Sequence, residues 1–255
     1  MNEVTFLFSG KNFVVVGASS GMGRQIASEL ATAGAHVLAV ARNEERLAAL
    51  QESCPDRIET RCVDVTNAQD EDWNALFDDY STRHGKFHGG VYTAGIATTT
   101  ALRGYDELAA RNVMETGFWG ALRWIKAASK KKFAHNASSY VLFSSTAGYT
   151  GERGLSVYSA TKAALRVAMQ SLAHDLSREK HCINTISPGY VRTPATIGNE
   201  NRQGDMDSVL SRHLLGMGEP ENVSGMALFL LSDLAKWITG EDFVVDGGYL
   251  RGAWR

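Results

Sequence analysis

Cysteine and proline are both scarce in this chain of 255 residues. It has three cysteines and four prolines. The cysteines, Cys54, Cys62 and Cys182, are widely spaced and form no Cys-x-x-Cys pair, so we expect neither a disulfide framework nor a zinc site. The few prolines and the lack of a low-complexity stretch argue against a disordered chain and against a linker between domains.

The chain also lacks a large excess of positive or negative charge, and it has no long apolar run. Lys and Arg number 26 against 28 Asp and Glu, so no large cationic field would attract nucleic acid or an anionic membrane. The basic cluster at 130–132 follows an apolar helical pattern and is expected to be a solvated helix end. The apolar run from Val4 to Phe8 is too short for a signal peptide or a membrane span. We therefore expect a cytoplasmic protein without nucleic acid or membrane partners.

Short apolar runs alternate with helix-length segments along the chain. Strands are predicted at 13–16, 36–41, 61–63, 90–92, 140–144, 182–186 and 242–245, and the first two helices at about 21–34 and 44–53. Short strands that are apolar on both faces are typical of a parallel sheet covered by helices. The sequence therefore predicts one α/β domain over 1–255, a doubly wound Rossmann fold with a seven-stranded parallel sheet. The irregular stretch 192–219 is predicted to be a substrate loop and lid, or else a plain surface loop.

A glycine-rich turn follows the first predicted strand. Gly17, Gly21 and Gly23 are spaced Gly-x-x-x-Gly-x-Gly between a strand and a helix. Glycine lets the backbone turn sharply, and the free N–H groups at a helix start attract a pyrophosphate. Such turns also occur without a ligand, but the position at the start of a βαβ unit favours a nucleotide. The expected contacts between the glycines are Ser19, Ser20 and Met22.

The residue after the second predicted strand indicates which nucleotide binds. Arg42 stands where NAD-binding proteins carry an acid for the ribose hydroxyl. A guanidinium matches a 2′-phosphate in charge and geometry, so NADP(H) is predicted, with Ser19 as a second contact. If Arg42 is only solvated, NAD(H) or dual use is the alternative. Asp64 and Val65, at the end of the third strand, are expected near the adenine.

Tyr158 and Lys162 lie four residues apart on a predicted helix and therefore share one face. A nearby ammonium favours phenolate over phenol, so the pattern predicts a tyrosine whose pKa is lowered for acid–base chemistry. A bare Tyr-x-x-x-Lys is common by chance. Ser144 and Ser145 follow an apolar strand, at the edge where such sheets bind ligands. Either serine could reach a substrate oxygen, or both could simply form the turn that ends the strand.

Together these motifs resemble the short-chain dehydrogenases/reductases over nearly the whole chain. The matching motifs are Gly17-x-x-x-Gly21-x-Gly23, Asp64-Val65, Ala94-Gly95, Ser145, Tyr158-x-x-x-Lys162, Pro188-Gly189 and Asp246-Gly247-Gly248. The resemblance implies that Ser145 orients a carbonyl, that Tyr158 protonates it, and that Lys162 tunes the tyrosine and holds the nicotinamide ribose. It also implies homotetramers or dimers, and further cofactor contacts at Ala94, Gly95, Pro188, Gly189, Val191 and Thr193.

The chain departs from this family at the proton relay. The asparagine that usually supports the relay falls at Gly117. Glu115, Thr116, Asn112 or a backbone carbonyl with water are the candidate substitutes. The family's two asparagines before Ala94-Gly95 are also replaced here, by a tyrosine and a threonine at 92–93.

The sequence thus predicts a metal-free, NADP(H)-dependent carbonyl reductase or alcohol dehydrogenase that acts on a small molecule by hydride transfer. A 3-oxoacyl thioester is one candidate substrate. A sugar or polyol dehydrogenase is an alternative, favoured by the polar stretch at 199–202. A non-catalytic NADP(H) sensor on the same fold is the alternative from another class, favoured by Gly117.

Overall fold

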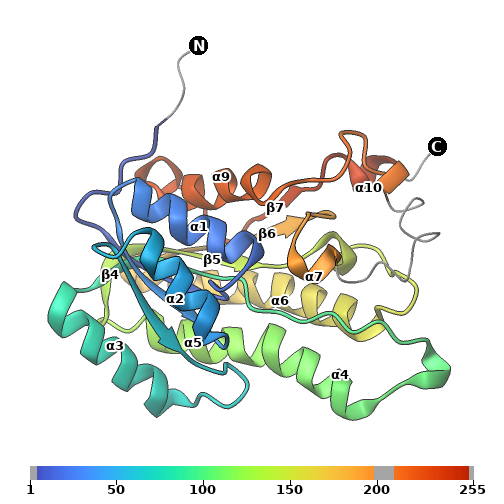
Figure 1. Ribbon diagram of the computed structural model, residues 1–255, viewed down its shortest axis with the longest axis horizontal. Coiled ribbons are helices and arrows are strands. Elements are labelled where there is room, and N and C mark those ends of the chain that lie inside the picture. Colours follow the sequence, from blue (N-terminus) through green and yellow to red (C-terminus); the bar gives the residue numbers. More distant parts are fainter. Residues whose placement is uncertain (1–4, 198–209, 253–255) are drawn as a thin grey trace.

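Seven parallel strands form a single sheet in the computed structural model, which describes residues 5–197 and 210–252 (Figure 1). Their order in the sheet is β3-β2-β1-β4-β5-β6-β7. The strands are β1 (Asn12–Val16), β2 (His36–Ala41), β3 (Ile58–Cys62), β4 (Phe87–Tyr92), β5 (Ala134–Phe143), β6 (Cys182–Pro188) and β7 (Asp242–Val245). The predicted fold class is confirmed.

Helices connect successive strands and cover both faces of the sheet. The α-helices are α1 (Gly21–Thr32), α2 (Glu44–Ser53), α3 (Asp70–His84), α4 (Glu107–Met114), α5 (Gly120–Ala128), α6 (Ser156–Asp175), α7 (Pro194–Ile197), α9 (Pro220–Leu231) and α10 (Tyr249–Gly252). Short 3-10 turns are η1 (Leu102–Gly104), η3 (Thr146–Gly148), η4 (Ser177–Glu179) and η6 (Asp233–Ala235), and η2 (Glu115–Trp119) is a π-helical turn between α4 and α5. No helix in the described ranges is long and apolar enough to cross a membrane.

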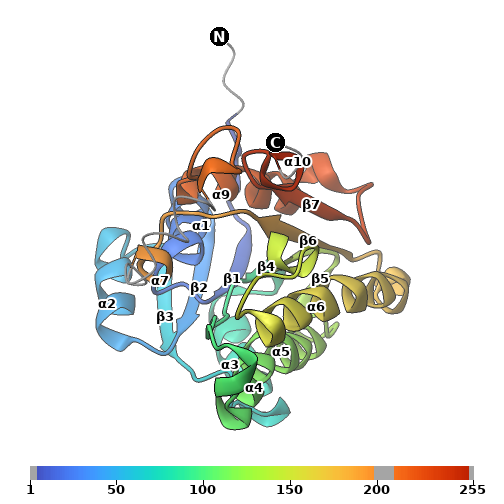
Figure 2. The same cartoon turned by 90° about the vertical axis from the view of Figure 1, so that its right-hand side faces the viewer.

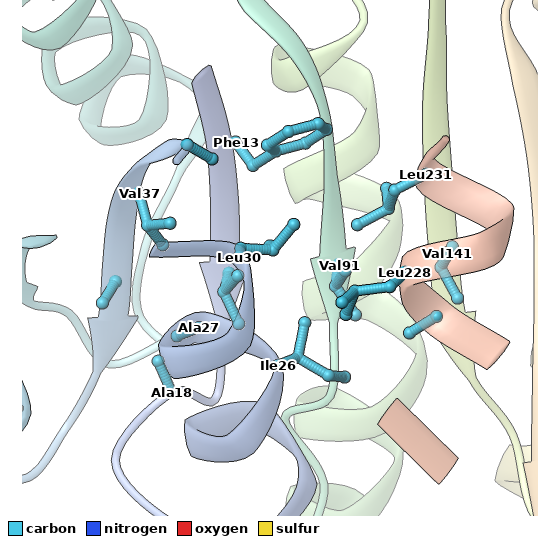
Figure 3. Close-up of a cluster of buried hydrophobic side chains, with 14 of the residues drawn as sticks. Phe13, Ala18, Ile26, Ala27, Leu30, Val37, Val91, Val141, Leu228 and Leu231 are labelled. Atoms are coloured by element: carbon cyan, nitrogen blue, oxygen red, sulfur yellow. The ribbon is translucent and has the colours of Figure 1, made fainter. Parts of the chain in front are cut away.

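Two hydrophobic clusters hold these layers together. On one face, Ile26 and Leu30 of α1 and Leu228 of α9 pack toward Val91 and Val141 of the sheet (Figure 3). On the other face, buried aromatic and aliphatic side chains of α3, α5 and α6 meet the strands, namely Trp73, Phe77, Trp124, Leu165 and Met169. α1 and α9 thus lie on one side of the sheet and α3, α5 and α6 on the other (Figure 2).

The strand order reverses direction between β1 and β4. From β1 the chain first adds β2 and β3 on one side, and it then returns to add β4 to β7 on the other. At such a switch point the loops after the strands diverge and leave a crevice at the carboxyl edge. The fold therefore places the glycine turn after β1 and the serines after β5 at the same edge of the sheet.

The strands occur in the predicted number and order, but three of them begin well before their predicted bounds: β3 and β4 by three residues and β5 by six. β2, α2 and β7 have the predicted bounds, whereas β3 begins three residues before the predicted 61–63. β3 is an edge strand, and its Glu59 and Arg61 form an ion pair on a part-exposed face. An edge strand keeps one side open to water, so the strand lacks the continuous apolar run on which the prediction rested.

Gly89 permits the close pairing of β4 with β5. Its φ is +151°, and a Cβ at this position would lie 1.9 Å from the Ser139 carbonyl oxygen, at a register shift between the two strands. The atom in the way belongs to the backbone of the neighbouring strand, so it cannot rotate aside. A side chain here would force the central strands apart.

We expect Gly89→Ala to lower the free energy of unfolding by about 3 kcal/mol, because it combines overpacking with an unfavourable φ. The measurement is urea denaturation followed by circular dichroism. Gly225→Ala is the matched control, since Gly225 lies in α9 with nothing within 4 Å of its Cβ position. The control should gain roughly 0.5–1 kcal/mol from helix propensity. Equal stability of the Gly89→Ala variant and the parent protein would contradict this account.

Candidate active site

A cavity of about 750 Å³ opens at the carboxyl edge of the sheet. It is formed by the segments that follow β1, β2, β4, β5 and β6, together with the start of α6. The predicted site residues that line it are Gly17, Ser19, Ser20, Gly21, Met22, Gly23, Arg42, Val65, Ala94, Gly95, Ser145, Tyr158, Lys162, Pro188, Gly189, Val191 and Thr193. The fold therefore brings together residues that are up to 176 positions apart in the chain, from Gly17 to Thr193.

The glycine turn is packed so closely that side chains are excluded. A Cβ on Gly17 would lie 2.4 Å from Thr93 Oγ1, and a Cβ on Gly23 would lie 2.3 Å from the Gly17 carbonyl oxygen. Gly17 also has φ +89°, and Thr93 Oγ1 donates a hydrogen bond to the Val16 carbonyl at 2.9 Å. The Thr93 N–H donates to the same carbonyl at 2.8 Å, so Thr93, which follows β4, holds the turn through both its hydroxyl and its backbone.

The start of α1 fits an anion. Ser20 is the N-cap residue, and its side chain makes no capping hydrogen bond to the first turn. The N–H groups of that turn and the helix dipole therefore favour a negatively charged group beside the glycines. The residues present fit the diphosphate of a dinucleotide.

Two arginines lie at the end of the cavity next to this turn. Arg42 follows β2 and is half-exposed, with Nη1 4.0 Å from Asp64 Oδ2. Arg46 also lines the cavity, and its backbone N–H donates to the side chain of Asn43, the N-cap residue of α2, at 2.8 Å. Sequence reasoning missed Arg46, although its place in the first turn of the helix that follows Arg42 is a signal that could have found it.

Of the two residues expected near the adenine, Val65 lines the cavity and Asp64 does not. Asp64 Oδ1 accepts hydrogen bonds from the Thr66 N–H at 3.0 Å and from the Thr66 hydroxyl at 2.8 Å. Burial works against ionisation, but the two bonds from Thr66 and the charge of Arg42 hold the pKa of Asp64 below its usual value. Asp64 therefore shapes the turn after β3, and its contact with the adenine stays a prediction.

The structure distinguishes the two serines after β5. The Ser144 hydroxyl donates to the backbone carbonyl of Lys162 at 2.9 Å and is buried. Ser145 lines the cavity, and its hydroxyl interacts with Tyr158. Ser144 thus ties the strand to α6, and Ser145 is the serine beside the phenol.

Tyr158 and Lys162 lie on one face of α6, as their spacing predicts. Lys162 Nζ lies 5.7 Å from the centre of the Tyr158 ring and donates to the Phe143 carbonyl at 2.6 Å. Burial lowers the pKa of Lys162 to about 8. The ammonium is thus held by a neutral carbonyl at the end of β5.

The expected lowering of the tyrosine pKa is wrong for the protein without ligand. Burial raises the pKa of Tyr158, the hydrogen bond with Ser145 lowers it, and the charge of Glu152 raises it. The ammonium of Lys162 does not offset these effects. The phenol therefore keeps its proton at neutral pH, as a proton donor must.

Gly117 lies in the π-helical turn η2, facing α6. A Cβ at Gly117 would lie 2.7 Å from Cγ2 of Thr161, which is buried. The threonine methyl group therefore takes the space that a side chain at 117 would need. Of the three side chains considered as substitutes for the relay asparagine, Thr116 lines the cavity, whereas Asn112 and Glu115 line a separate surface hollow.

The other end of the cavity is lined by residues that sequence reasoning missed. Glu152 comes from the loop before α6, His213 from the segment before α9, and Tyr249 from α10. Tyr249 follows the Asp246-Gly247-Gly248 motif directly, which is a signal that could have found it. No sequence pattern singles out Glu152 or His213. Residues 198–209 of the predicted substrate loop, including 199–202, lie outside the described residues.

Comparison with known proteins agrees with this geometry. A family model described as enoyl-(acyl carrier protein) reductase matches residues 17–250. The NADP-dependent (R)-specific alcohol dehydrogenase of Lentilactobacillus kefiri is 28% identical over 252 residues, covering 96% of this chain and 99% of its own length. A 3-oxoacyl-(acyl-carrier-protein) reductase of Aquifex aeolicus is 30% identical over 244 residues, covering 94% and 97%.

The backbone arrangement is also shared with solved structures. A short-chain type dehydrogenase/reductase from Mycobacterium ulcerans superposes with a TM-score of 0.90 at 29% identity, covering 96% of this chain and 92% of that protein. The family model extends from the glycine turn to the start of α10, so it includes the loops that line the cavity. The chain belongs to the short-chain dehydrogenase/reductase family.

Proposed function

We propose that this protein interconverts a carbonyl compound and a secondary alcohol, with NADP(H) as the redox partner. One observation carries the proposal: Ser145, Tyr158 and Lys162 line the same cavity as the glycine turn that fits a diphosphate. A 3-oxoacyl thioester is one substrate that the name of the Aquifex relative would support.

Each of the three residues has a part that follows from its position. The nicotinamide, when bound, supplies or accepts the hydride. Ser145 donates a hydrogen bond to the carbonyl oxygen, where negative charge develops. Tyr158 gives its phenolic proton to that oxygen in the direction of reduction. Lys162, charged below a pKa of about 8, stabilises the phenolate that remains.

The preference for NADP(H) rests on the two arginines. Arg42 and Arg46 line the nucleotide end of the cavity. Guanidinium groups suit a 2′-phosphate in charge and geometry, whereas a free ribose hydroxyl offers them no negative charge. The relative from Lentilactobacillus kefiri is named NADP-dependent, which supports the same choice.

We also propose that the protein works as a homo-oligomer. Leu108 of α4, Trp119 of η2 and Val167 of α6 are large apolar side chains that are at least half exposed. Their burial against a second copy would remove apolar surface from water. The cytoplasmic location stays a prediction from the sequence.

Tyr158→Phe should abolish reduction while leaving NADPH binding within about twofold, because phenylalanine keeps the ring and lacks only the proton. We expect kcat to fall by at least ~10³-fold, in the range for loss of a general acid. NADPH oxidation with a ketone panel measures the first effect, and quenching of protein fluorescence measures the second. Tyr105→Phe, in which an exposed tyrosine outside the cavity is changed, is the matched control. Turnover by Tyr158→Phe at the parent rate would refute the assignment.

Arg42→Ala should weaken NADPH binding roughly 10- to 100-fold and leave NADH binding nearly unchanged, because only NADPH carries the 2′-phosphate. Dissociation constants for both nucleotides test this. Arg111→Ala is the control, since Arg111 is an exposed arginine on α4 that pairs with Glu107. If the ratio of the two constants stays at the parent value, Arg42 does not select the nucleotide.

The rate of reduction should fall as the pH rises past about 8, where Lys162 loses its charge. The sign follows because the ammonium favours the phenolate that is formed when Tyr158 gives up its proton, and neutral lysine does not. We expect a decline in kcat that approaches tenfold per pH unit above that point. The pH profile should be measured with saturating NADPH. A flat profile up to pH 9.5 would show that the charge on Lys162 is not needed.

A further inference from the structure

Glu152 is a carboxylate at the substrate end of the cavity that the proposed chemistry does not use. It lies in the loop between η3 and α6 and lines the same cavity as Ser145 and Tyr158. Two backbone hydrogen bonds hold its loop. The Leu155 N–H donates to the Glu152 carbonyl at 3.1 Å, and the Thr100 N–H donates to the Gly154 carbonyl at 2.9 Å. The position of the carboxylate is therefore set by ordered backbone.

The carboxylate of Glu152 has unused hydrogen-bonding capacity. The hydroxyl of Tyr249 donates to Glu152 Oε1 at 3.0 Å. No lysine, arginine or histidine within 5–197 and 210–252 forms an ion pair with Glu152. An ionised carboxylate has about four acceptor sites, and Tyr249 takes one of them. The others can accept from a donor in the cavity.

Glu152 shares a cavity with the groups that would meet the carbonyl. Ser145 and Tyr158 line this cavity together with Glu152, and the negative charge of Glu152 contributes to the raised pKa of Tyr158. A substrate whose carbonyl oxygen meets Tyr158 and Ser145 can therefore present a neighbouring group to the carboxylate.

The surroundings of Glu152 favour a neutral donor over a cation. The Tyr249 ring that abuts the carboxylate is already contacted by the Arg212 guanidinium, 4.1 Å from the ring centre, and by the His213 ring at 4.6 Å. The Arg212 guanidinium thus already occupies the aromatic surface. A substrate ammonium would meet repulsion from Arg212, whereas a hydroxyl would meet an acceptor alone.

We propose that Glu152 selects the substrate by accepting a hydrogen bond from a hydroxyl group close to the reacting carbonyl. The substrate class is then a hydroxylated ketone, or a polyol in the oxidising direction. This inference rests on the proposed carbonyl–alcohol chemistry. Tyr249 is a positioning residue, since its hydroxyl holds the carboxylate. A substrate without the hydroxyl leaves the carboxylate desolvated and without its partner, which is the physical basis of rejection.

Matched ketone pairs test the proposal. Hydroxyacetone and 2-butanone differ by a hydroxyl in place of a methyl group, as do 1-hydroxy-2-butanone and 3-pentanone. The quantity to measure is the ratio of kcat/KM for the two members of a pair with NADPH. We expect Glu152→Ala to lower this ratio roughly 10- to 100-fold, as for the loss of a hydrogen bond to a charged group. Glu152→Gln, which keeps an acceptor oxygen, should restore part of it.

Asp175→Ala is the control for the loss of one negative charge. Asp175 is exposed at the last residue of α6, 17 residues after Tyr158 and therefore about 25 Å away along the helix axis. The Asp175→Ala variant should have the same ratio of kcat/KM for each ketone pair as the parent protein. A ratio in Glu152→Ala that also equals the parent ratio would overturn the proposal.

A third pair of ketones tests the alternative that Glu152 binds a positively charged group of the substrate. Dimethylaminoacetone and 4-methyl-2-pentanone have similar shapes, and only the first carries a positive charge. One outcome would overturn our proposal. The parent protein would prefer the amine, Glu152→Gln would lose that preference, and the same variant would leave the ratios of the hydroxyl pairs unchanged. Glu152 would then bind a cationic substrate.

Failure of the proposed chemistry has a different signature. In that case NADPH binds but none of the six ketones is reduced. Saturation-transfer NMR of hydroxyacetone and 2-butanone, with Tyr158→Phe and NADPH, then still tests Glu152 without turnover. Stronger binding of hydroxyacetone that is lost in Tyr158→Phe combined with Glu152→Ala would support the role of Glu152, and equal binding of the two ketones would refute it.

Discussion

Two hydrogen bonds between the end of β5 and the start of α6 hold the reactive groups in place. Lys162 Nζ donates to the Phe143 carbonyl, and the Ser144 hydroxyl donates to the Lys162 carbonyl. Burial of an ammonium group is costly unless a polar group accepts a hydrogen bond from it. The bond to the Phe143 carbonyl therefore makes the burial of Lys162 possible. Because Ser145 directly follows this anchor and Tyr158 lies one helical turn before Lys162, the distance between serine and phenol depends on it.

The pairing of Gly117 with Thr161 shows how a departure from the family pattern is accommodated. The methyl group of Thr161 occupies the place where a side chain at 117 would begin. The hydroxyl of the same threonine donates to the Val157 carbonyl within α6, so it is already engaged. The Thr161 methyl group thus fills the space left by the missing side chain at 117. Among the side chains weighed as polar substitutes, Thr116 alone lines the cavity, although its hydroxyl donates to the Asn112 carbonyl.

Much of the fold and of the nucleotide end could be predicted from the sequence, because both depend on local patterns. Apolar runs, glycine spacing and the interval between Tyr158 and Lys162 are all short-range signals. The direction of the pKa shift of Tyr158 could not be predicted from the sequence, since it depends on how deeply the side chain is buried after folding. Glu152 was missed for a similar reason. Its meeting with Tyr249 joins positions 97 residues apart, and no periodicity marks either of them.

The Thr93 hydroxyl bonds to the end of β1, and it stands where a side chain at Gly17 or Gly23 would have to go. Three positions on two different βα connections therefore share one small volume. Grafting a nucleotide loop from another family member onto this scaffold would have to carry the matching residue at 93 with it. The cofactor loop is a module in sequence but not in space.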